Sequence, residues 1–144
     1  MPTLYTEITI HASRSAVWRS LIRKDHWLKW NTFLYDLSPD QPFRQGDRVL
    51  LSLKRDSRES ETEIEPYITL LQPEVCLGWV YKAPGFQSDH RFQLQDIDRD
   101  RTQYTHRISF SGALSPVFLP WIRRDEQQGM RRMALGLKRF VEGH

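Results

Sequence analysis

The sequence WIRRDEQQGMRRMALGLKRFV, residues 121–141, has the spacing of a long amphipathic helix. Its apolar side chains recur at helical intervals and fall on one stripe: Ile122, Met130, Met133, Leu137, Phe140 and Val141. Gly129 and Gly136 lie within this helix, although glycine costs about 1 kcal/mol there relative to alanine. Either these glycines leave room for a ligand or for close contact with a sheet, or Gly129 marks a kink or a late helix start.

Most of the chain before this helix has the alternating period of β-strands. Strands are predicted at residues 5–11, 31–37, 46–53, 61–72, 75–82, 90–94 and 104–110. Pro66 disturbs the fourth of them, which indicates a bulge or an edge position. Residues 55–60 are predicted to form a hairpin loop, and residues 112–120 a loop with an apolar stretch.

Two helices are predicted between the first and second strands. Ser13 is suited to cap the first, which includes residues 16–22, and the second is short and covers residues 25–30. The order is therefore β-α-α-β6-α in a single domain, residues 1–144, of the α+β class. We expect a curved antiparallel sheet wrapped around the C-terminal helix, with a hollow between them because one helix cannot cover so wide a sheet.

Several short motifs occur in an order typical of one superfamily. The end of the first strand and the residues after it, 8–13, lead into Ala16-Val17-Trp18, and a tryptophan–asparagine corner follows at residues 27–31. His90-Arg91-Phe92 and Phe110-Ser111-Gly112 lie in the last two strands. Together these segments resemble the START-like (SRPBCC) superfamily, and within it the polyketide cyclase/dehydrase branch. The resemblance implies a helix-grip fold with an interior cavity, a fold that serves both ligand binders and enzymes.

In a helix-grip fold the inward strand faces and the last helix would line that cavity. The residues expected to contact a ligand are Trp30, Phe33, Leu51, Leu53, Trp79, Tyr81, His90, Phe92, Tyr104, His106, Ile108, Met130, Met133 and Leu137. Alternating apolar residues more commonly just fill a core. The family resemblance favours the partly hollow interior, and with it the binding of a small hydrophobic molecule that is aromatic, polyketide or lipid-like.

Four of these residues are polar: Tyr81, His90, Tyr104 and His106. If buried, each needs a hydrogen-bond partner, and a few polar groups in an apolar pocket orient a ligand. The alternative function is a polyketide cyclase or aromatase that uses one of the four as a general acid or base. For each histidine alone, a structural role is the commoner one.

Other chemistry finds little support in the sequence. If the chain turns near residues 98–100, His106 lies opposite Phe92 or Leu94 and the two histidine rings are offset along the strands. No metal site and no cofactor are therefore expected. Cys76 is out of phase with Trp79, so we expect it to face away from the cavity and not to act as a nucleophile.

Composition restricts the partners. The net charge of +3 is too small to indicate a nucleic-acid binder, and no apolar run is long enough for a membrane span. We expect a cytoplasmic protein without integral membrane association, compatible with a homodimer. The arginines of the last helix and the apolar stretch at residues 118–121 leave a third function open, that of a partner-binding regulatory module.

Overall fold

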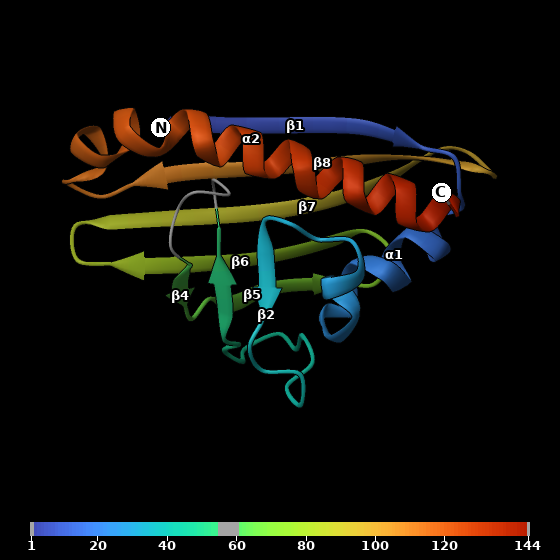
Figure 1. Ribbon diagram of the computed structural model, residues 1–144, viewed down its shortest axis with the longest axis horizontal. Coiled ribbons are helices and arrows are strands. Elements are labelled where there is room, and N and C mark those ends of the chain that lie inside the picture. The colour runs from blue at the N-terminus through green and yellow to red at the C-terminus, as the bar shows by residue number, and fades with distance from the viewer. Residues whose placement is uncertain (1, 55–60, 144) are drawn as a thin grey trace.

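The computed structural model describes residues 2–54 and 61–143. The expected loop at residues 55–60 lies outside this range. In chain order the elements are β1 (Thr3–Ile10), α1 (Arg14–Ile22), the 3₁₀ helix η1 (Lys24–Lys29), β2 (Leu34–Asp36), β3 (Leu51–Leu53), β4 (Thr62–Ile64), β5 (Tyr67–Gln72), β6 (Cys76–Ala83), β7 (Phe86–Asp98), β8 (Arg101–Ser111) and α2 (Ser115–Glu142). The expected α+β class and the long C-terminal helix are confirmed (Figure 1).

The strands form two antiparallel sheets in place of the single one expected. The larger has the order β1-β8-β7-β6-β5, and the smaller has the order β2-β3-β4. The predicted strand at residues 61–72 divides at Pro66 into β4, which pairs with β3, and β5, which pairs with β6. Because proline has no amide hydrogen, the ladder stops there and the chain changes sheets. The described strands after the helices therefore number seven, one more than predicted.

The helix α2 begins earlier than predicted. Residues 115–120 were expected in a loop, yet the helix starts at Ser115 and contains both Pro116 and Pro120. Pro116 lies in the first turn, where no amide donor is required. Pro120 removes a single amide donor from the second turn. The helix ends at Gly143, which adopts a left-handed conformation at the C-cap.

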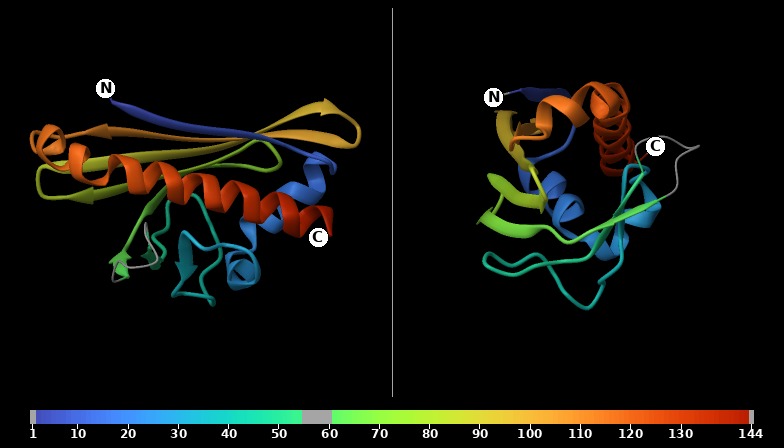
Figure 2. Two further views of the ribbon diagram at one scale, coloured as in Figure 1. Left: turned by 45° about the horizontal axis from the view of Figure 1, so that its top comes forward. Right: turned by 90° about the vertical axis from the view of Figure 1, so that its left-hand side faces the viewer.

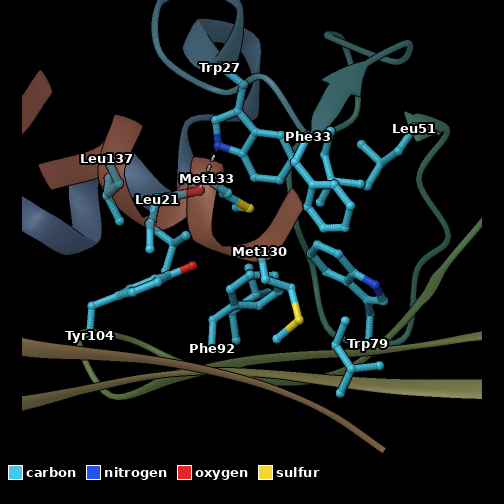
Figure 3. Close-up of a cluster of buried hydrophobic side chains, with 14 of the residues drawn as sticks. Leu21, Trp27, Phe33, Leu51, Trp79, Phe92, Tyr104, Met130, Met133 and Leu137 are labelled. Carbon is cyan, nitrogen blue, oxygen red and sulfur yellow. Dashed lines mark hydrogen bonds between the residues drawn. The ribbon is translucent and has the colours of Figure 1, made fainter. Parts of the chain in front are cut away.

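The larger sheet, α2 and the segments of the smaller sheet surround a common interior (Figure 2). Aromatic rings fill its centre (Figure 3). Trp79 of β6 lies 4.8 Å from Phe92 and 5.8 Å from Phe43, and Phe43 lies 5.6 Å from Trp27, measured between ring centroids. Met130, Met133 and Leu137 of α2 close this core from the helix side.

The corner between η1 and β2 is fixed by hydrogen bonds from buried side chains. The Asn31 side-chain oxygen accepts from the amides of Phe33 and Leu34, each at 3.0 Å. The Trp27 indole donates to the Leu21 carbonyl at 3.0 Å, which ties η1 to α1. The corner predicted at residues 27–31 is thus a rigid connection that sets where the chain enters the core.

Lys24 adds a buried ion pair to this corner. Its ammonium donates to the Asp36 carboxylate at 2.8 Å and to the Ser38 carbonyl oxygen, and both charged side chains are almost fully buried. This pair joins η1 to the end of β2. Removing one partner of such a pair leaves the other charge buried and unpaired, which is strongly destabilising. The folded corner therefore depends on both Lys24 and Asp36.

The two glycines of α2 permit close contact between the helix and this corner. A Cβ atom at Gly129 would overlap the Phe33 ring, and one at Gly136 would overlap the Trp30 carbonyl oxygen. These glycines permit close contact as one interpretation held, but the partner is the segment Trp30–Phe33 and not the sheet that this interpretation named. The alternative of a late helix start at Gly129 is wrong.

Both edges of the larger sheet are paired or covered. Along β1, Gln127 and Lys138 of α2 donate to the carbonyl oxygens of Tyr5 and Thr9, each at 2.9 Å. Along β5, the Ile68 amide donates to the Asp47 carbonyl at 2.9 Å. Within the described part of the chain, no helix is long and apolar enough to cross a membrane.

The helix–corner contact predicts the effect of Gly136→Ala. The added methyl group meets a backbone oxygen that cannot rotate away, so we expect a loss of about 1–3 kcal/mol in unfolding free energy, despite the higher helix propensity of alanine. Urea unfolding followed by circular dichroism measures it. Gln128→Ala, at an exposed position of the same helix, is the control and should change stability little. Equal or greater stability of Gly136→Ala would contradict the contact.

Candidate functional site

A small cavity lies where β6, β7 and β8 face the N-terminal half of α2. Its volume is about 20 Å³. Apolar side chains form most of its wall: Leu34, Leu53, Ile64, Phe86, Phe110 and Ile122. Four polar side chains complete it: Tyr81, Ser88, His90 and Glu126. This volume holds about one water molecule, whereas pockets for drug-sized ligands measure about 300–1,000 Å³.

The expected ligand-contacting residues divide into two groups. Leu53, Tyr81 and His90 line the cavity. The others are buried in the core and do not line it: Trp30, Phe33, Leu51, Trp79, Phe92, Tyr104, His106, Ile108, Met130, Met133 and Leu137. Among the described residues, Phe33 fills the space opposite Gly129 and the Trp79 ring stacks on Phe43, so this part of the interior is packed.

The two inward-facing histidines contact each other. The predicted register is confirmed, since His106 pairs with Phe92 and His90 pairs with Ile108. The rings are offset along the ladder as expected, yet His90 Nδ1 lies 3.0 Å from His106 Nε2, within hydrogen-bond distance. Diagonal neighbours on adjacent strands are close enough for such contacts, and this spacing is the signal that sequence reasoning missed.

Burial and the neighbouring His90 hold the pKa of His106 well below its usual range. His106 is therefore neutral near pH 7. Its ring stacks on Phe92 with centroids 3.9 Å apart, and its Nδ1 atom has no hydrogen-bond partner among the described residues. The His90 ring contacts His106 and also lines the cavity, so it connects the buried ring to the cavity wall.

Sequence analysis missed two polar residues of the cavity, Ser88 and Glu126. Ser88 is 4% exposed and Glu126 is 3% exposed. Ser88 precedes His90 by two residues, so the strand period places both side chains on the same face. Glu126 lies four residues from both Ile122 and Met130 on the buried stripe of α2, and this helical spacing could have identified it.

The tyrosine candidates lie in different surroundings. Tyr81 lies at the half-buried rim of the cavity. Tyr104 is fully buried, its hydroxyl has no partner in the described part of the chain, and burial raises its pKa far above the usual value. Figure 3 shows this hydroxyl directed toward Leu21 and Met133, into the core. Of the two, only Tyr81 is placed to contact a molecule in the cavity.

Cys76 lies on the opposite face of β6 from Trp79, as the strand period predicted. Burial raises the pKa of its thiol, although Arg91 on the neighbouring strand partly offsets this effect. Among residues 2–54 and 61–143, no three His, Cys, Asp or Glu side chains are grouped so that they could hold a metal ion.

No protein-family model and no curated protein sequence matches the chain. Several solved structures, however, are similar to it in fold. A START superfamily protein from Mycobacterium smegmatis is 14% identical with a TM-score of 0.73, covering 98% of this chain and 97% of its own. The di-domain ARO/CYC BexL from the BE-7585A biosynthetic pathway is 15% identical with a TM-score of 0.74, covering 99% of this chain and 47% of its own.

Norcoclaurine synthase from Thalictrum flavum, solved with dopamine and hydroxybenzaldehyde, is also similar. It is 13% identical with a TM-score of 0.72, and the match covers 99% of this chain and 87% of that one. These identities are low, but the likeness extends over nearly the whole chain. The protein therefore has the START-like helix-grip fold that its sequence motifs indicated.

The buried histidine pair predicts how stability depends on pH. Below about pH 6.5 the histidine at position 106 binds a proton in the unfolded chain but not in the folded one. The unfolding free energy should therefore decrease as the pH is lowered, by up to about 1.4 kcal/mol per pH unit. Urea unfolding between pH 7.5 and 5 measures this slope. His106→Gln should reduce it. Tyr104→Phe, which removes no group that titrates in this range, should keep it. An unchanged slope in His106→Gln would contradict the low pKa.

Proposed function

We propose that the protein binds a small, mostly apolar molecule whose polar group enters the cavity beside His90 and Glu126. The observation that supports this is the composition of the cavity wall, in which three polar side chains of the sheet and one of α2 lie among apolar ones. Such an arrangement fixes the orientation of a ligand by hydrogen bonds while its apolar part is buried. A hydroxyl-bearing aromatic molecule satisfies both requirements.

The ligand must enlarge the cavity, because the present volume holds about one water molecule. The half-buried side chains at the rim, Tyr81, Phe86 and Ile122, are the ones that can move. The core beyond Trp79 and Phe33 is fully buried and stays packed. We therefore infer that the ligand occupies the end of the interior near the β6–β7 turn, and that the residues deeper in the core support the site without contacting the ligand.

A matched pair of probes tests this proposal. We expect 2-naphthol to bind more tightly than naphthalene, because only the former has a hydroxyl that the polar wall can bind, and to shift the backbone amide NMR signals of Ser88, His90 and Glu126. Ser88→Leu fills the cavity and should weaken binding at least about tenfold. Ser109→Leu, on the opposite face of the sheet, should not. Failure of 2-naphthol to shift these signals would reject the site.

A second candidate function is acid–base catalysis, which the contact between His90 and His106 favours. In this function His90 removes a proton from carbon between two carbonyl groups of a poly-carbonyl substrate. The carbanion attacks a second carbonyl, a carbon–carbon bond forms, and the resulting alkoxide takes a proton back. His106 would hold the His90 ring in position, and a cyclase or aromatase would result.

Turnover of a poly-β-carbonyl substrate distinguishes catalyst from binder. If the protein is a cyclase, His90→Gln should lower kcat by about 10²-fold or more, the usual contribution of a general base. Tyr104→Phe, buried away from the cavity, should retain the native rate. An unchanged rate in His90→Gln would remove the catalytic role and leave the binding proposal intact.

A further inference from the structure

An open groove of about 380 Å³ lies on the outer face of the larger sheet, over β5 and β6. Val80 and Lys82 of β6 line it, whereas Tyr81 between them lines the cavity on the inner face. Successive side chains of a strand point to opposite faces, so the groove and the cavity lie back to back across the sheet. The groove has the volume of a pocket for a small organic molecule. We call it the outer groove.

A β-bulge in β5 places an unused polar group at the outer groove. Ile68 pairs with Trp79 and Leu70 pairs with Gly78, so Thr69 is an extra residue without a partner across the ladder. The Thr69 side chain lines the groove, and its hydroxyl is buried with no hydrogen-bond partner among the described residues. Rotation about the Cα–Cβ bond presents this hydroxyl to the groove. A buried hydroxyl without a partner is unfavourable, and a ligand in the groove would supply one.

Two cationic side chains line the outer groove. Arg48 bridges to Tyr67 at the edge of β5, and Lys82 lies on β6, so the two reach the groove from opposite sides of β5. Within residues 2–54 and 61–143, neither forms an ion pair. The Arg48 guanidinium lies over the Tyr67 ring, 5.6 Å from its centroid, which holds this charge at the groove wall. Both charges therefore remain available to a ligand.

Acidic side chains at the outer groove limit the charge of the ligand. Glu65 also lines the groove, so its wall carries two positive charges and one negative charge. Asp89, opposite Val80 on β7, is ion-paired with Arg91 at 3.3 Å and does not change this balance. A singly charged anion matches such a wall better than a doubly charged phosphate, which Glu65 would repel more strongly.

We propose that the outer groove binds a small aromatic carboxylate. Its carboxylate group lies between Arg48 and Lys82, which donate charge-assisted hydrogen bonds. Its ring lies on Val80 and the Tyr67 side chain, which are the apolar surfaces of the groove. The Thr69 hydroxyl adds a neutral hydrogen bond. Since the outer groove and the cavity open on opposite faces of the sheet, this site does not rest on the proposed function.

Three probes of similar shape and different charge test the proposal: 2-naphthoate, 2-naphthamide and 2-naphthylmethylammonium. We expect 2-naphthoate to bind about tenfold more tightly than 2-naphthamide, because only the carboxylate is attracted by both cations, and the ammonium probe to bind most weakly. Titration followed by NMR should shift the backbone amide signals of Thr69, Val80 and Lys82. Equal affinity for the three probes, or no shift at these residues, would overturn the proposal.

Charge variants assign the contact to the outer groove. The double variant Arg48→Gln/Lys82→Gln should weaken 2-naphthoate binding about tenfold, and Glu65→Gln should strengthen it. The control is Arg19→Gln/Lys29→Gln, which removes the same charge from exposed positions of α1 and η1 and should leave binding unchanged. Circular dichroism confirms that each variant is folded. Equal weakening in the two double variants would show an effect of net charge alone and would reject the site.

The bulge has its own test. Thr69→Val removes the hydroxyl at nearly constant side-chain size and should weaken 2-naphthoate binding about threefold. Thr105→Val, at a half-buried position on the outer face of β8 and outside the groove, is the matched control and should bind as the native protein does. Unchanged affinity in Thr69→Val would show that the hydroxyl does not contact the ligand and would overturn the role given to the bulge.

A crossed comparison separates the outer groove from the cavity. Ser88→Leu should retain 2-naphthoate binding, because the Ser88 side chain lies on the inner face of the sheet. The double variant of Arg48 and Lys82 should retain 2-naphthol binding, since neither residue lines the cavity. Loss of 2-naphthoate binding in folded Ser88→Leu would place this probe in the cavity and overturn the outer groove. Failure of 2-naphthol alone would reject only the proposed function.

Discussion

The approach of α2 to the corner at Trp30–Phe33 governs the interior of this protein. At Gly129 and Gly136 the helix has no Cβ atom, so the Phe33 ring and the Trp30 carbonyl lie directly against its backbone. The Asn31 hydrogen bonds and the buried Lys24–Asp36 ion pair hold this corner in place against the helix. The middle of the interior is consequently closed by contact, and the small cavity lies toward the N-terminal half of the helix, beside Glu126.

The two ends of the interior differ in how fully their side chains are buried. Around Trp27 and Trp79 the aromatic rings are fully buried and in mutual contact through Phe43. Around Phe86 and Ile122 the side chains are half-buried, and the polar groups of the cavity lie just inside them. Under the proposed function, a ligand at this end would move these half-buried side chains and leave the hydrogen-bonded corner intact.

Much of this arrangement could be predicted from sequence, because it depends on local periodicity. Alternation in β7 and β8 and the turn between them gave the correct pairing of His106 with Phe92. The second sheet could not be predicted, since a break at Pro66 does not reveal which strand pairs with which. The size of the cavity could not be predicted either. It depends on whether Phe33 occupies the space that Gly129 leaves, a contact between residues ninety-six positions apart.

The covering of the edge strands has a consequence for behaviour at high concentration. An exposed edge presents unpaired amides and carbonyls on which strands of other molecules can add, which leads to aggregation. Along β1, Gln127 and Lys138 occupy the carbonyls of Tyr5 and Thr9, and along β5 the loop at Asp47 pairs with Ile68. The same helix that closes the core therefore also occupies part of the β1 edge, so that loosening α2 would expose the core and that edge together.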